Sequence, residues 1–137
     1  SGRALPITRR NIARHGAGRV ALVQGDLLDA VAARSADLIL SNPPYIAHRE
    51  LAELPREVRD HEPRRALDGG DDGLVLIRRL VRGALRCLRP GGGLMFEIGF
   101  DQGQSAAEVC HAAGLVEVAV HQDLAGLDRV VAAAREA

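Results

Sequence analysis

The stretch of sequence that decides the fold is Asp37-Leu38-Ile39-Leu40-Ser41-Asn42-Pro43-Pro44-Tyr45. The run from Asp37 to Ser41 predicts a strand that is apolar on both faces, as strands buried in parallel sheets usually are. Two prolines then end the strand in a rigid turn, with an amide on one side and a phenol on the other. In open α/β sheets, ligands bind beyond the carboxyl ends of the strands. The stretch therefore predicts a buried strand with a candidate site at its end.

The turn after this strand suits the methylation of a planar NH2 group. A carboxamide nitrogen is a poor nucleophile because its lone pair is delocalised into the carbonyl. The side-chain oxygen of Asn42 and the backbone carbonyl of Pro43 would accept its two N–H bonds, while Tyr45 lies flat against the group. The alternative is a plain turn, which Asn before Pro favours on local grounds. The candidate catalytic residues are Asn42, Pro43, Pro44 and Tyr45.

Strands alternate with helices along the chain. We predict helices over 5–15, 73–88 and 102–113, and strands over 19–24, 37–41, 94–99, 115–121 and 129–134. Apolar residues at three- and four-residue spacing make 73–88 the clearest helix. The short connection between the last two strands favours an antiparallel pair. This order predicts an α/β sheet with helices packed on its faces and a C-terminal antiparallel hairpin.

Two connections stand out. Pro90-Gly91-Gly92 predicts a tight turn between a helix and a strand. The polar stretch 46–72 is too long for an ordinary connection, so we expect a functional lid or binding segment. A disordered insert is the alternative.

Composition limits the class of protein. A chain of 137 residues suffices for one domain. Its 18 basic and 18 acidic residues give a formal net charge of zero, which argues against a strong nonspecific nucleic-acid binder. Cys87 and Cys110 lack metal-site spacing and predict two buried thiols in a reducing compartment. No signal peptide or membrane-spanning run is evident, so we expect a cytoplasmic protein without membrane contact.

Short motifs along nearly the whole chain resemble one family. They are Gln24-Gly25-Asp26-Leu27, residues 37–46, residues 57–63, residues 66–70, Asp72-Gly73-Leu74, residues 88–92, Glu97-Ile98-Gly99, Asp101-Gln102-Gly103, residues 123–126 and Asp128-Arg129-Val130. Together they resemble the S-adenosylmethionine-dependent N5-methyltransferases that modify a glutamine of peptide-chain release factors. The stretch 57–73 is the specific part, because Asn-Pro-Pro-Tyr alone is shared with adenine-N6 DNA methyltransferases.

The resemblance implies roles for particular residues. Asn42 to Tyr45 would receive the substrate glutamine, with Asn42 also near the methyl donor. Asp26 and Leu27 would border the adenine of S-adenosylmethionine, although Asp26 is alternatively a polar cap on the following turn. Glu97 is either a buried hydrogen-bonded carboxylate or a pocket-lining residue. The implied partner is a release factor, with no metal and no direct nucleic-acid contact.

Part of the family's pattern has no counterpart in this sequence. The family has a helical domain, a first strand leading into a glycine-rich turn, and a second strand ending in an acid, all before the position of Ser1, which would match a helix N-cap. We therefore expect one N-terminally incomplete domain over 1–137, with a partial class I methyltransferase (Rossmann-like) sheet that lacks the first two strands. Strand 37–41 would then expose an apolar edge. We expect either direct pairing between 19–24 and 37–41 or pairing between two chains.

Three functions are compatible with these motifs. The first is a protein-glutamine N5-methyltransferase, with the activity of the isolated chain left open. The second is an adenine-N6 nucleic-acid methyltransferase, which the neutral charge and the stretch 57–73 disfavour. The third is a methyltransferase-fold fragment that binds no cofactor.

Overall fold

A four-stranded mixed sheet forms the centre of the computed structural model, which describes residues 2, 4–16 and 18–137. Its strands are β1 (Ala36–Ser41), β2 (Leu88–Glu97), β3 (Val116–Gln122) and β4 (Asp128–Ala134), in the spatial order β1-β2-β4-β3. β1 is parallel to β2, whereas β4 runs antiparallel to both β2 and β3. The predicted α/β class and C-terminal hairpin are confirmed. The N-cap prediction for Ser1 lies outside the described residues.

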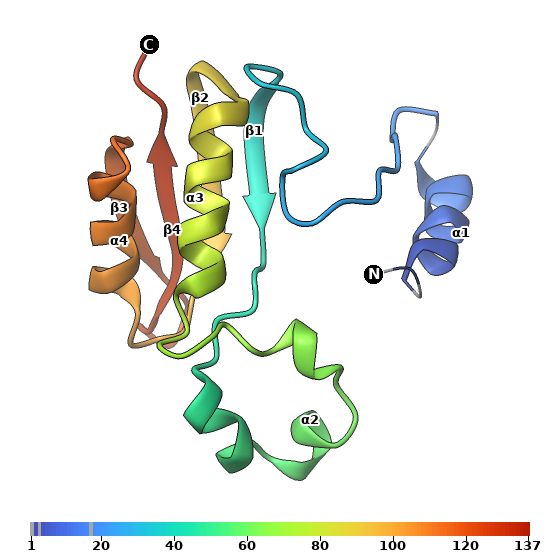
Figure 1. Cartoon of the computed structure of the whole chain (residues 1–137), viewed down its shortest axis with the longest axis vertical. Helices are drawn as coiled ribbons and strands as arrows, with labels where there is room; N and C mark the ends of the chain where they lie inside the picture. The colour runs from blue at the N-terminus through green and yellow to red at the C-terminus, as the bar shows by residue number, and fades with distance from the viewer. Residues whose placement is uncertain (1, 3, 17) are drawn as a thin grey trace.

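Two helices, α3 (Val75–Cys87) and α4 (Gly103–Ala112), lie side by side against one face of the sheet (Figure 1). The predicted apolar stripe is confirmed, because Ile77, Leu80 and Val81 of α3 are buried in the same cluster as Leu94 and Phe96 of β2. Burying a side chain of this size contributes about 1.5–3 kcal/mol. The core therefore holds α3 firmly against the central strand.

The first helix, α1 (Leu5–His15), is confirmed with its proline in the first turn, where a missing N–H costs nothing. None of its residues is buried, and Figure 1 shows it apart from the sheet. No described helix is long and apolar enough to cross a membrane.

The stretch 46–72 is an ordered loop rather than the disordered insert that was the alternative. It contains η1 (His48–Glu53), α2 (Arg56–Arg59) and η2 (Arg64–Ala66). A bridge closes the loop at its base, where Ile46 donates to Leu67 at 3.0 Å and Gly69 donates back to Ile46 at 2.8 Å. The loop thus leaves the sheet after β1 and returns to the same place before α3.

The predicted strand 19–24 is wrong. The structure has no strand there, and all six residues are exposed. Sheet formation needs a partner for the backbone N–H and C=O groups, and this stretch finds none. The expected direct pairing with 37–41 is therefore wrong as well.

The strand predicted over 94–99 begins earlier and ends earlier, because β2 spans Leu88–Glu97. The tight turn predicted at Pro90–Gly92 is instead a bulge within β2, since Ala36 pairs with Leu88 and Leu38 already pairs with Gly93. A side chain at Gly92 would lie 3.2 Å from two carbonyl oxygens of β1. The glycine therefore permits a close approach of the two strands.

The outer edge of β1 has no partner strand in the described chain. Ile39 is buried, whereas Leu38 and Leu40 are 55% and 69% exposed. The expected apolar edge is confirmed, but the expected burial of both faces of this strand is wrong. The face opposite α3 and α4 is uncovered because α1 does not pack on it.

Candidate functional site

The turn Asn42–Tyr45 lies at the carboxyl end of β1, beside the end of β2. The parallel register places Ser41 next to Phe96, so the residues that follow them, Asn42 and Glu97, meet at the same sheet edge. From the sequence, a catalytic role was predicted for Asn42, and the role of Glu97 was left open. Parallel pairing is what brings them together.

Glu97 joins the two polar side chains of the turn. The Asn42 Nδ2 donates to Glu97 Oε2 at 3.2 Å, and the Tyr45 hydroxyl donates to Glu97 Oε1 at 3.0 Å. Glu97 is half-buried rather than buried, and it lines a depression on the sheet, so the pocket-lining reading agrees with the structure, whereas of the other reading only the hydrogen bonding does. Its carboxylate fixes two side chains of the candidate site at once.

The environment keeps the Tyr45 hydroxyl protonated. Burial raises the pKa of Tyr45, and the hydrogen bond and charge of Glu97 raise it further, while Arg129 acts in the opposite direction. Because the pKa lies above its ordinary value near 10, the phenol is a neutral donor at physiological pH. The hydroxyl therefore remains able to donate to Glu97.

The backbone of the turn is held from a second side. The Gln102 Nε2 donates to the carbonyl of Tyr45 at 2.9 Å, and the Gln102 Oε1 accepts from the N–H of Gly99 at 2.9 Å. Gly73 adopts a φ of +75°, and a Cβ at this position would clash with the carbonyl oxygen of Tyr45. Both residues lie in motifs noted from the sequence, but neither was given a role, because each acts through a contact distant along the chain.

Two hollows meet at Asn42. A shallow depression of 360 Å³ runs over the uncovered sheet face, and a cavity of 160 Å³ opens toward η2. Asn42 is exposed, Pro43 is buried, and Pro44 and Tyr45 are half-buried. Asn42 is common to both hollows, whose linings are Leu40, Ser41, Asn42, Met95, Phe96, Glu97 and Val130 for the first and Asn42, Pro43, Pro44, Tyr45, Ile46, Ala66 and Leu67 for the second.

Asp26 and Leu27 are not gathered with Asn42. The Asp26 carboxylate pairs with Arg79 of α3 at 2.6 Å rather than capping the turn that follows it. Leu27 is half-buried with a φ of 48°. Neither residue lines the two hollows at Asn42. The adenine role of Asp26 and Leu27 therefore stays a prediction.

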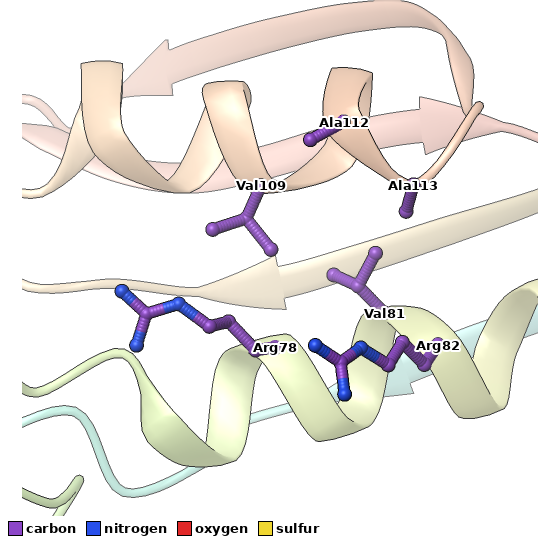
Figure 2. Close-up of a pocket in the computed structure, with 6 residues that line it drawn as sticks. All are labelled: Arg78, Val81, Arg82, Val109, Ala112 and Ala113. Carbon is purple, nitrogen blue, oxygen red and sulfur yellow. The ribbon is translucent and has the colours of Figure 1, made fainter.

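A separate cavity of 200 Å³ lies between α3 and α4. Figure 2 shows the side chains of Arg78 and Arg82 extending toward the start of α3 beside Val81 and Val109. Arg78 is bound to Asp72, and none of the residues lining this cavity lines the hollows at Asn42. In the part of the chain that the structure describes, no group of three or more His, Cys, Asp or Glu residues could hold a metal ion.

Comparison with known proteins relates the chain to methyltransferases. Residues 1–58 match the family described as "Methyltransferase small domain". The chain is 46% identical to the release factor glutamine methyltransferase of Caulobacter vibrioides over 132 residues, which are 96% of this chain and 46% of that protein. It is 50% identical to the protein of the same name from Cereibacter sphaeroides over 131 residues, 95% of this chain and 47% of that one. The chain spans about half the length of the curated relatives it matches.

The fold agrees with that relationship. A crystal structure of a methyltransferase from Pyrococcus furiosus superimposes with a TM-score of 0.66 at 16% identity, covering 100% of this chain and 60% of that one. At this identity the likeness concerns the fold alone. The predicted class I methyltransferase architecture of the sheet is confirmed.

Proposed function

We propose that the chain carries the glutamine-receiving site of the release factor glutamine methyltransferases, to which it is 44–50% identical over 93–96% of its own length. The proposed reaction moves a methyl group from S-adenosylmethionine to the side-chain amide nitrogen of a glutamine in a peptide-chain release factor. The observation that carries the proposal is the contact between Asn42 and Glu97 at the carboxyl end of β1.

The proposed role of the turn is to orient the amide. Because the Asn42 nitrogen faces Glu97, its Oδ1 is free to accept one N–H of the substrate amide. The carbonyl of Pro43, fixed by a ring that is buried, accepts the second. Both bonds then point the nitrogen lone pair away from the protein and toward the methyl donor. Aligning the substrate amide and the methyl donor in this way supplies much of the decrease in activation free energy that such a site can achieve.

Tyr45 flanks the planar amide in this proposal. Its hydroxyl is anchored on Glu97 and its carbonyl on Gln102, so the ring has little freedom to rotate away. No protein base is required, because the methylated nitrogen is strongly acidic and loses its proton to water. S-adenosylmethionine supplies the electrophilic methyl group when it is bound.

The proposed partner and location follow from the substrate. A release factor acts in translation, so we place the protein in the cytoplasm. Cys87 and Cys110 are both buried free thiols, which suits a reducing compartment. Burial raises the pKa of the Cys110 thiol to about 11, so this side chain stays protonated and unreactive.

We also propose that two chains pair through the open edge of β1. Unpaired edges template further strands, and the exposed Leu38 and Leu40 lie on this one. A formal net charge of zero leaves little overall repulsion between copies. Within one chain, the stretch 19–24 does not occupy this edge.

A methyl-transfer assay tests the proposed function. The chain is incubated with a release factor, or with adenine-containing DNA, and methyl-labelled S-adenosylmethionine. We expect mass spectrometry to find one added methyl group on a glutamine of the release factor and no label in the DNA. Label on adenine would support the nucleic-acid methyltransferase instead.

Calorimetry with S-adenosylmethionine separates a catalyst from a fragment. Binding is expected if the chain contributes to the cofactor site. A chain that binds no cofactor and transfers no methyl group would be a methyltransferase-fold fragment, and the proposed activity would be wrong for it.

A further inference from the structure

We propose that Glu97 makes the site selective for a primary amide over a carboxylate, by fixing which end of the Asn42 side chain faces the substrate. The inference deepens the proposed function and rests on it. It assigns Glu97 a positioning role, since its contacts are with Asn42 and Tyr45.

The first step concerns the orientation of the Asn42 amide. An ionised carboxylate only accepts hydrogen bonds, and each Glu97 oxygen already has a donor, Asn42 for Oε2 and Tyr45 for Oε1. If the Asn42 amide turned over, its Oδ1 would face a carboxylate oxygen, and the bond would be replaced by a repulsion between two acceptors. Glu97 therefore holds the Asn42 nitrogen inward and the oxygen outward.

The second step concerns what that orientation can bind. The outward groups of the turn, the Asn42 Oδ1 and the Pro43 carbonyl, are both acceptors. The side chain of glutamine offers two N–H donors to them, whereas the side chain of glutamate offers none. A site built to bond substrate N–H groups rejects an analogue that lacks them, because its own polar groups are left unpaired.

The third step is that the fold holds Glu97 in place. It is the last residue of β2, paired with Val130 of β4, and its neighbours Phe96 and Ile98 are buried. Arg129, whose charge also reaches Tyr45, is bonded to Asp123 at 3.1 Å. A carboxylate set on a central strand positions its partners more accurately than one on a loop.

The replacement Glu97→Gln changes the hydrogen-bonding groups at position 97 while it keeps the size and shape of the side chain. Its side-chain NH2 can donate to the Asn42 Oδ1, which frees Asn42 to turn its own NH2 outward. The site then presents a donor, which a carboxylate accepts. The matched control is Asp101→Asn, which removes an exposed carboxylate from the loop after β2 and lines only the hollow beyond Tyr45.

The experiment compares two peptides that differ only in one residue, glutamine or glutamate, by NMR titration of the whole chain. We expect wild type and Asp101→Asn to bind the glutamine peptide about tenfold or more tightly than the glutamate peptide, and Glu97→Gln to lose that ratio.

A phenol titration reports independently on the Glu97 contact. The chain has one tyrosine and no tryptophan, so the absorbance change of phenolate formation belongs to Tyr45 alone. Because Glu97 helps raise the pKa of Tyr45, Glu97→Gln should lower that pKa, whereas Asp101→Asn should leave it unchanged. Circular dichroism shows separately that the variant is folded, because unfolding would expose Tyr45 and lower the same pKa.

Each other outcome is decisive. Equal binding of both peptides by wild type would overturn the inference and leave the proposed function standing. A wild-type ratio in Glu97→Gln would overturn it as well. A wild-type chain that binds neither peptide would contradict the proposed function and the inference together.

Discussion

Two stretches of six residues, Arg19–Gln24 and Ala36–Ser41, have similar aliphatic sequences and opposite fates. The first is exposed and forms no strand, whereas the second is β1 of the sheet. The difference is the partner, because β1 lies in register with β2 and the first stretch has no neighbour. Strand propensity describes how well a side chain fits a pleated surface, so it forms no strand where that surface is missing.

The same contrast between packed and unpacked residues extends to the longer segments that contain these two stretches. Every buried residue of the described chain lies between Ile39 and Ala133, and none lies in the described part of residues 2–35. The candidate turn is within the packed segment, whereas Asp26 and Leu27 are within the unpacked one. The packed segment should therefore account for both stability and substrate positioning.

The largest expected effect is on catalysis. Asn42→Ala removes the proposed acceptor of the substrate amide, so methyl transfer should fall about a hundredfold or more while circular dichroism stays unchanged. Asn11→Ala, a matched change on the exposed face of α1, should leave the rate near that of wild type. Near-normal turnover by Asn42→Ala would show that the role of Asn42 is wrong.

Stability should show the next largest contrast between the two segments. Leu80 on α3 is 2% exposed and Leu22 is 36% exposed. Leu80→Ala should lower the free energy of unfolding by about 2–5 kcal/mol, because it leaves a cavity in the core. Leu22→Ala should change it by less than about 0.5 kcal/mol. Urea denaturation measures both, and equal losses would mean that residues 19–24 are packed in solution.

Self-association should respond to the open edge. Leu40→Lys places a charge on the unpaired strand β1, and charged edge residues disfavour edge-to-edge pairing. We expect light scattering to show dimers of the wild type and a shift toward monomers in the variant, with Leu124→Lys, in the exposed loop between β3 and β4, as a control. A wild type that stays monomeric at high concentration would refute pairing through β1.

The smallest expected effect concerns the loop between β1 and α3. The N–H of Gly70 lowers the pKa of Asp68, and the charges of His48 and Arg64 act in the same direction. A carboxyl with a lowered folded-state pKa stabilises the fold above its unfolded value, and that stabilisation is lost as the pH falls through the lowered pKa. The difference in unfolding free energy between wild type and Asp68→Asn should thus be present above about pH 4 and shrink below it. A difference for Asp68→Asn that is constant with pH would contradict this linkage.

How much could be predicted from sequence depends on the range of the interactions. Helix α3 follows from local spacing, and the hairpin of β3 and β4 follows from a short connection, so both were predicted correctly. The predicted strand over 19–24 was wrong, because strand formation depends on a partner far along the chain. The predicted start of β2 was wrong for a related reason, because the pairing of Leu88 with Ala36 extends the strand through a bulge.

The candidate site divides in the same way. Asn42 to Tyr45 were predicted from a local motif, and in the structure Asn42 and Tyr45 both donate to Glu97. The role of Glu97 could not be chosen from sequence, because 55 residues separate it from Asn42 and only the parallel register joins them. Gln102 carried no local signal, since its contact is with a backbone carbonyl.

The most direct test of the central claim uses a glutamine peptide whose side-chain amide carries nitrogen-15. Nuclear Overhauser effects from that NH2 group to the protein are recorded on the whole chain, whose one tyrosine makes the ring signals unambiguous. The account predicts contacts with the Tyr45 ring that disappear in Asn42→Ala. A bound peptide whose amide protons contact no part of the turn Asn42–Tyr45 would contradict it.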